Sequence, residues 1–133
     1  MPEPECRYLL YRVEDGVLVL TLSVSQLQDE KMAAGVLAEL TACVDQYKSD
    51  KVVLDMRNIK YISSVAFRPL LNLRRKLQDA QGRLVLCGLS SEVGDVFYTT
   101  RLISSGGSFA APFDMEPDVP AAIARLNAPQ QPA

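Results

Sequence analysis

Apolar and polar residues change their spacing several times along the chain, and each change predicts a different element. Two apolar runs, RYLLYRV and GVLVLTL, flank Glu14-Asp15-Gly16, and an Asp-Gly pair in this position is a strong signal for a β-hairpin. Ser25 and Gln28 have the spacing of a capping box, which predicts that a helix begins there. The apolar residues behind them recur mostly every fourth position and trace one helical face: Met32, Val36, Leu40, Val44 and Tyr47.

Short strands and helices alternate after this helix. KVVLDM and RLVLCG are continuous apolar runs, typical of parallel strands that are buried on both faces. The segment between them predicts a helix that ends near Gln81-Gly82, with one apolar and one polar face. The apolar stripe contains Phe67, Leu70, Leu71 and Leu77, and the opposite face contains Arg68, Asn72, Arg75 and Lys76.

The last third of the chain predicts two more helices, separated by a loop and a weak strand. Ser90 or Ser91 can cap the first of these helices, whose apolar positions are Val93, Val96, Phe97 and Leu102. SSGGS, residues 104–108, is a flexible loop, and FAAPF is a weak strand. Asp114 or Asp118 opens the final short helix, which ends in AAIARL.

This order of elements predicts a single α/β domain. The opening antiparallel hairpin and the parallel strands form a mixed sheet with right-handed crossovers, and about four helices pack on it. We expect the domain to span residues 7–127, between an N-terminal extension (1–6) and a disordered tail (128–133). A chain of 133 residues can bury such a core without disulfide or metal support.

The composition excludes several classes of function. A formal net charge of −2 gives no field that would attract nucleic acid. The chain contains no histidine, which excludes a Ser/His/Asp or Cys/His nucleophile system and removes the commonest metal ligand, so we expect no enzyme, cofactor or metal site. Cys6, Cys43 and Cys87 are odd in number and widely spaced, which favours buried thiols in a reducing compartment.

The N-terminus and the apolar runs also bear on location. Acidic residues and prolines stand where an export signal needs a basic start and an apolar stretch. The longest apolar run is far shorter than the ~20 residues that span a bilayer. We therefore expect a cytoplasmic protein with no segment inserted in a membrane.

Two serines, Ser63 and Ser64, stand where an apolar run turns into a helix. A serine in this position usually caps the helix, which is worth roughly 1 kcal/mol against alanine. The alternative is a functional role, because the serines follow Asp55 at the carboxyl end of a predicted parallel strand, where open α/β sheets commonly carry functional groups.

The segment VVLDMRNIKYISSVAFRPLLNLRRKLQDAQGRLVLCGLSSEV resembles the core of a STAS domain. That family pattern is an apolar strand ending in Asp, a motif close to (I/M)(D/S)S(S/A)GL, a helix, and a strand followed by SPEV. The chain matches the pattern at Val52 to Asp55, at Tyr61 to Ser64, at Leu70-Leu71 and at GRLVLCGLSSEV. The opening hairpin and the closing strand and helix also stand where the family has them.

The resemblance implies a regulatory binding module that switches partners. In anti-sigma factor antagonists of this family, a serine or threonine at the start of this helix is phosphorylated by a kinase of the histidine-kinase-like ATPase type, which is itself the anti-sigma factor. The unmodified antagonist binds that partner, and the phosphorylated antagonist releases it. A phosphate suits a helix start but weakens a contact that is built around a neutral hydroxyl.

Aligned with the family motif, the chain departs at several positions. Ser63 takes the place of the Asp, Ser64 the first serine, Val65 the second serine and Ala66 the glycine. Antagonists usually modify the second serine, whereas stressosome-like members use the position of Ser64. We therefore predict phosphorylation at Ser64, with Ser63 as the second choice. The predicted partner-binding residues are Asp55, Ser63, Ser64, Val65 and Arg68.

Several alternatives stay open. Asp55 can cap its own loop instead of contacting a partner. Arg74, Arg75 and Lys76 are interpreted as a solvated helix end, and Pro69 leaves open whether the helix starts after Ser64 or at Pro69 itself. A STAS scaffold that binds partners without a switch, in a stressosome-like or transport-associated complex, is the second hypothesis for function. A homodimer and a nucleotide or acyl pocket at the strand ends are further possibilities.

Overall fold

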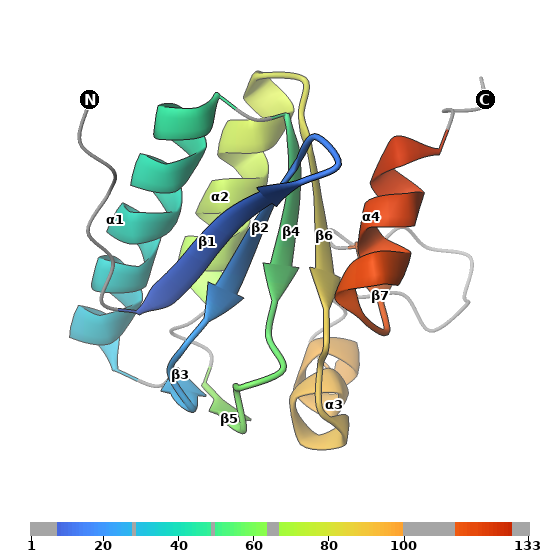
Figure 1. Ribbon diagram of the computed structural model, residues 1–133. Helices are drawn as coiled ribbons and strands as arrows, with labels where there is room; N and C mark the ends of the chain where they lie inside the picture. The colour runs from blue at the N-terminus through green and yellow to red at the C-terminus, as the bar shows by residue number, and fades with distance from the viewer. Residues whose placement is uncertain (1–7, 28, 49, 64–66, 100–113, 129–133) are drawn as a thin grey trace.

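A five-stranded mixed sheet forms the centre of the chain (Figure 1). The computed structural model describes residues 8–27, 29–48, 50–63, 67–99 and 114–128. The strands run in the order β1 (Leu9–Glu14), β2 (Val17–Leu22), β4 (Lys51–Asp55), β6 (Arg83–Cys87) and β7 (Asp114–Glu116). β1 is antiparallel to β2, and the other neighbouring pairs are parallel. The predicted α/β fold with a mixed sheet is confirmed.

The opening hairpin has the turn that its sequence predicts. Glu14 pairs with Val17, and Asp15 and Gly16 between them have φ angles of 53° and 77°. A two-residue turn with positive φ at both positions matches the twist of the flanking strands, and Asp-Gly is among the pairs that adopt it most easily.

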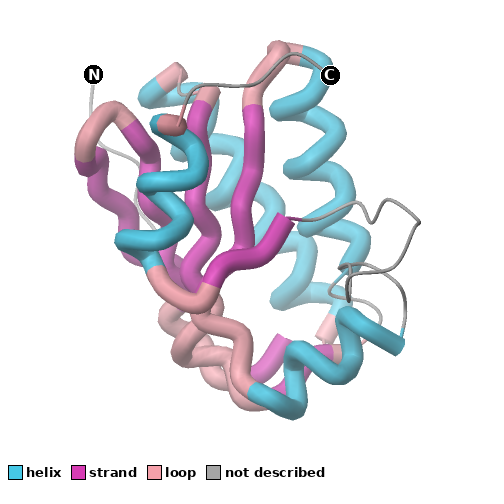
Figure 2. Tube along the Cα trace, turned by 90° about the vertical axis from the view of Figure 1, so that its right-hand side faces the viewer, coloured by secondary structure: helices cyan, strands magenta, loops and turns pink. Residues whose placement is uncertain are grey.

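Helices cover both faces of the sheet (Figure 2). α1 (Glu30–Tyr47) and α2 (Phe67–Asp79) lie on one face, and α4 (Val119–Asn127) lies on the other; α3 (Ser91–Thr99) follows β6 at the lower end of the sheet. Side chains alternate along each strand, so Leu54 faces α1 and α2 whereas Val53 faces α4. None of the helices in the described ranges is long and apolar enough to cross a membrane.

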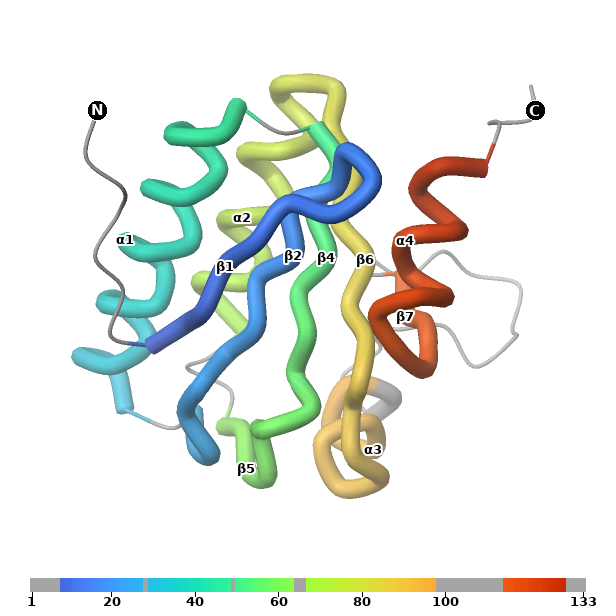
Figure 3. Tube along the Cα trace, viewed as in Figure 1, coloured from blue at the N-terminus to red at the C-terminus, as the bar shows by residue number. Residues whose placement is uncertain are grey.

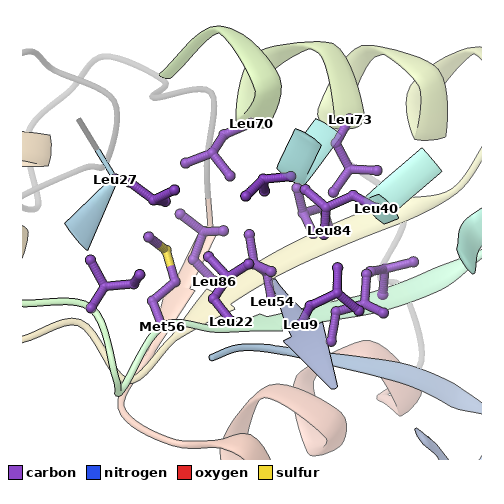
Figure 4. Packing of buried hydrophobic residues seen from close by; sticks show 14 of the residues in the cluster. Leu9, Leu22, Leu27, Leu40, Leu54, Met56, Leu70, Leu73, Leu84 and Leu86 are labelled. Carbon is purple, nitrogen blue, oxygen red and sulfur yellow. The ribbon is translucent and has the colours of Figure 1, made fainter. Parts of the chain in front are cut away.

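The larger core lies between the sheet and the pair α1 and α2. Figure 4 shows leucines of the central strands meeting leucines of the two helices, among them Leu22, Leu54, Leu86, Leu40, Leu70 and Leu73. All six are completely buried, and burial of such a side chain stabilises the fold by roughly 1.5–3 kcal/mol. Cys43 and Cys87 are buried free thiols, as the sequence indicates, while Cys6 lies outside the described residues.

Two of the predicted helix caps are confirmed and one is wrong. The backbone N–H of Val93 donates to Ser90 Oγ at 3.2 Å, and that of Ala121 donates to Asp118 Oδ1 at 2.9 Å. The first helix does not begin at Ser25, because the next residues form the short strand β3 (Gln26–Leu27). Asp29 is its cap instead and accepts from the N–H of Lys31 at 2.8 Å.

The second helix differs from its predicted apolar face at one position, and it begins before Pro69. Leu71 is 37% exposed, and Leu73 occupies the core in its place, because apolar residues at 67, 70, 73 and 77 keep to one face of a 3.6-residue helix. The helix is already formed at Phe67, so Pro69 is its third residue and not its first. Proline is tolerated in the first turn because an N–H there has no intrahelical acceptor.

Several predictions fall on parts of the chain outside the described residues. They concern Ser64 to Ala66, Leu102, the loop SSGGS, the weak strand FAAPF, the extension 1–6 and the end of the tail. The described strand β7 follows FAAPF directly, and Asp114, one of the two candidate helix starts, lies in that strand.

Candidate partner-binding site

Asp55 ends β4 and holds the turn that follows it. Its side chain is 2% exposed. Oδ1 accepts a hydrogen bond from the backbone N–H of Arg57 at 3.1 Å, and Arg57 Nε lies 3.0 Å from Oδ2 as an ion pair without the alignment of a hydrogen bond. Asp55 is thus engaged with its own loop, as the capping alternative has it. Because the carboxylate of Asp55 is buried, it cannot contact a partner directly. The side chain of Arg57 beside it is 62% exposed and can do so.

The strand after β4 pairs with the short strand β3, which lies between β2 and α1. β5 (Tyr61–Ile62) pairs in parallel with β3, so that Gln26 lies opposite Tyr61. The N–H groups of Lys60 and Tyr61 donate to the carbonyl of Ser25 at 2.7 and 3.2 Å. Figure 3 shows the chain running from β4 into β5 at the lower end of the sheet. This two-stranded platform was not predicted, because a two-residue strand leaves no periodic signal.

Further contacts hold the platform and the residues next to it in place. Asn58 Nδ2 donates to the carbonyl of Leu22 at 3.0 Å. The N–H of Ser63 donates to the carbonyl of Leu27 at 2.8 Å, and the ring of Phe67 packs edge-on against Phe97 of α3, with centroids 5.2 Å apart. The residues on either side of Ser64 to Ala66 are therefore both anchored.

The predicted site residues have different exposures. Ser63 is half-buried, and its Oγ is buried without a hydrogen-bond partner. Arg68 is exposed in the first turn of α2. Ser64 and Val65 lie outside the described residues. The structure thus brings Asp55, Ser63 and Arg68 to the same end of the sheet, but only Arg68 offers an accessible side chain.

A polar cavity of about 260 Å³ lies beside Asp55 on the α4 side of the sheet. Its walls come from β1, the turn after β4 and the start of α4: Arg12, Glu14, Asp55, Arg57, Gly88, Pro117, Asp118, Val119 and Pro120. Three carboxylates offset two guanidinium groups here, so the lining does not favour a ligand of either charge. Within the described ranges, no group of three or more acidic or cysteine side chains could hold a metal ion.

The thiol of Cys87 lies next to this turn and is not a nucleophile at neutral pH. Burial raises its pKa from 9.0 to about 12, and the negative charge of Asp55 adds to the shift. Since the thiolate is the reactive form, Cys87 stays protonated and inert.

Comparison with known proteins identifies the family. The STAS domain family matches residues 8–115, which include the sheet except for the last residue of β7, as well as α1, α2, α3 and the predicted site. This chain belongs to the STAS family. This STAS protein is 37% identical over 92 residues to BtrV of Bordetella bronchiseptica, which is named as an anti-sigma factor antagonist. The match covers 68% of this chain and 75% of BtrV.

Solved structures show that this STAS fold is shared with anti-sigma factor antagonists. The crystal structure of an anti-sigma factor antagonist from Mycobacterium paratuberculosis superposes with a TM-score of 0.74 at 19% identity, over 90% of this chain and 93% of that chain. The Bacillus cell fate determinant SpoIIAA in its phosphorylated form superposes with a TM-score of 0.63 at 18% identity, over 90% and 99% of the two chains.

Proposed function

We propose that this STAS protein is an anti-sigma factor antagonist whose binding to its partner is switched by phosphorylation of Ser64. The observation that supports this most is the frame around the serine. Ser63 is bonded to β3, and Phe67 begins α2 against α3. A three-residue segment between two anchored points can present a hydroxyl at a helix start.

The partner in this proposal is an anti-sigma factor that is also a serine kinase of the histidine-kinase-like ATPase type. In this proposal the unphosphorylated chain binds the kinase, and the phosphorylated chain dissociates from it. Phosphorylation adds nearly two negative charges and three acceptor oxygens to a contact that was built for a hydroxyl, so the complex loses stability. The role proposed for this chain is binding, and the chemistry belongs to the kinase.

Ser64 is preferred because the alternative, Ser63, is poorly placed for a kinase. A kinase must bring the serine Oγ into line with the γ-phosphate of ATP, and the Oγ of Ser63 is buried. Asp55 enters the proposal as a positioning residue, because its buried carboxylate holds Arg57. Val65 and Arg68 flank the serine and are proposed to touch the partner directly.

The experiment uses a candidate serine kinase of this type from the genome that encodes this chain. The purified protein is incubated with that kinase and ATP, and tryptic peptides are analysed by mass spectrometry. We expect one phosphate on Ser64, none on this peptide in Ser64→Ala, and an unchanged yield in Ser91→Ala, which removes an exposed serine at the start of α3. Ser64→Asp should weaken kinase binding about tenfold or more, where each factor of ten is 1.4 kcal/mol.

A scaffold without a switch is the second candidate. It is favoured by Val65 and Ala66, which replace the usual phosphorylated residue and the glycine of the family motif. An unmodified Ser64 peptide, together with unchanged partner binding by Ser64→Asp, would establish the scaffold and discard the switch.

A further inference from the structure

The exposed side of α2 has a composition that its place in the fold does not explain. The helix carries four basic side chains and one acidic side chain, within a chain of formal net charge −2. Its exposed residues include Arg68, Leu71, Asn72 and Arg75. These four have the spacing of one helical stripe, which we call the α2 stripe. From Arg68 to Arg75 it extends about 10 Å at 1.5 Å per residue.

Arg68 stands at the wrong end of the helix for stability. A cation in the first turn opposes the helix dipole, which favours acidic residues there, and the first turn of α2 contains none. Within the described part of the chain, Arg68 makes no ion pair. Its position therefore costs the fold a small amount of stability, which no ion pair with the described residues offsets.

Arg75 and Leu71 are equally unsupported by intramolecular contacts. Lys76 pairs with Asp45 of α1 at 2.9 Å, which accounts for one of the cations at this helix end. Arg75 is exposed and, among the described residues, has no acidic partner, so it is not explained in the same way. Leu71 lies between the two arginines and leaves 37% of its surface in water.

Another exposed side chain lies at the same end of the sheet as Arg68. Tyr61 of β5 is 51% exposed and lies two residues before Ser63. Tyrosine and arginine are enriched at the centres of protein interfaces, whereas binding of a polyanion is dominated by contacts between many basic residues and phosphates. Leu71, Tyr61 and the acidic net charge of the chain all favour a protein as the occupant.

We propose that the α2 stripe is a docking surface for an acidic patch on the partner protein, and that phosphorylation of Ser64 also acts through it. This inference rests on the proposed function. Ser64 precedes Arg68 by four residues in the sequence, so a phosphate on Ser64 adds negative charge to the segment that leads into the stripe. In this proposal the added charge weakens the attraction between the stripe and the acidic patch.

The test measures association and dissociation rates of the unphosphorylated protein with the same kinase at several salt concentrations. Arg75→Gln should lower the association rate constant about threefold at low salt and by less at high salt, because exposed charges steer encounter and are screened. Leu71→Ser should mainly raise the dissociation rate. Arg12→Gln is the matched control. It removes the same charge from β1, at the cavity on the opposite face of the sheet, and should leave both rates unchanged.

Other results would overturn the inference. Equal effects of Arg75→Gln and Arg12→Gln would show that only the net charge of the protein matters, and not the position of the stripe. An association rate that does not depend on salt would rule out an acidic patch as the binding partner of the stripe. Binding to duplex DNA or to phosphatidylglycerol vesicles that Arg75→Gln abolishes, with kinase binding unchanged, would assign the stripe to a polyanion. Ser64→Asp in the same assay separates the two proposals: release by Ser64→Asp without an effect of Arg75→Gln retains the switch and discards the stripe.

Discussion

At the scale of single residues, Gly88 shows how closely the turn at the site is packed. It follows β6 with a φ of +71°, and a Cβ there would stand 2.8 Å from Asp55 Oδ1 and 3.1 Å from the backbone N of Arg57. Only glycine both adopts this φ easily and leaves room for the carboxylate. The hydrogen bond from Arg57 to Asp55 therefore depends on the residue that follows the neighbouring strand β6.

We expect Gly88→Ala to lower the free energy of unfolding by roughly 1–3 kcal/mol, from backbone strain and displacement of the carboxylate. Urea denaturation followed by circular dichroism measures this change. Gly94→Ala is the control, because a Cβ at Gly94 meets nothing within 4 Å and alanine is the better helix former by about 1 kcal/mol. Equal effects of the two substitutions would show that the turn has no special packing.

The positions of Asp55 and Ser63 at strand ends were predictable, but the burial of their side chains was not. The sequence placed Asp55 and the serines at a strand end, and the structure agrees on the position of Asp55 and Ser63. Whether a carboxylate at such an end points outward or is buried depends on contacts from β6, far along the chain, which no local pattern contains. The same holds for the buried Oγ of Ser63.

At the scale of elements, α1 depends on a contact with the start of β1. The N–H of Tyr8 donates to Glu39 Oε1 at 2.8 Å, and the Tyr8 ring lies over Gly35, where a Cβ would come within 2.5 Å of Cε2. An interior helical glycine normally costs up to about 1 kcal/mol against alanine. In α1 the absence of a Cβ at Gly35 leaves room for the ring of Tyr8.

Gly35→Ala should therefore destabilise the protein by about 1 kcal/mol, where helix propensity alone predicts a gain of similar size. Thermal unfolding of Gly35→Ala, Tyr8→Ala and the double variant forms a double-mutant cycle. We expect Gly35→Ala to become stabilising once Tyr8 is alanine. A stabilising effect in the presence of Tyr8 would contradict the packing argument.

Long elements with strong periodicity were predictable, and short ones were not. The hairpin turn at Asp15-Gly16 and the strands KVVLDM and RLVLCG follow from local sequence. β3 and β5 exist only because they pair with each other, so their two residues each carry no signal. The same pairing explains why α1 is capped by Asp29 and not by Ser25, since Gln26 and Leu27 form a strand.

At the scale of the whole molecule, stability should be distributed according to sheet position. β4 is paired on both sides, and Val52, Val53 and Leu54 are completely buried. β7 has three residues and is paired with β6 alone among the described strands. Amides open with local free energies that follow such burial and pairing.

Hydrogen exchange of the native protein should therefore be slowest in β4, at least about a hundredfold slower than in β7. Exchange followed by mass spectrometry on peptides, or by NMR on single amides, measures the ratio. β2 and β6 provide internal references with two paired neighbours each. Protection of β7 equal to that of β4 would mean that the sheet opens as one unit.

The position of α4 has a consequence for synthesis of the chain. Its residues Val119, Ala122, Ile123 and Leu126 cover Val17, Val19, Val53 and Val85, which are translated earlier. During synthesis from the amino end, the apolar face that β2, β4 and β6 present to α4 therefore stays uncovered until residue 126 has left the ribosome. During that interval the nascent polypeptide is most prone to aggregate, and a chaperone that recognises valine-rich segments would find its binding sites there.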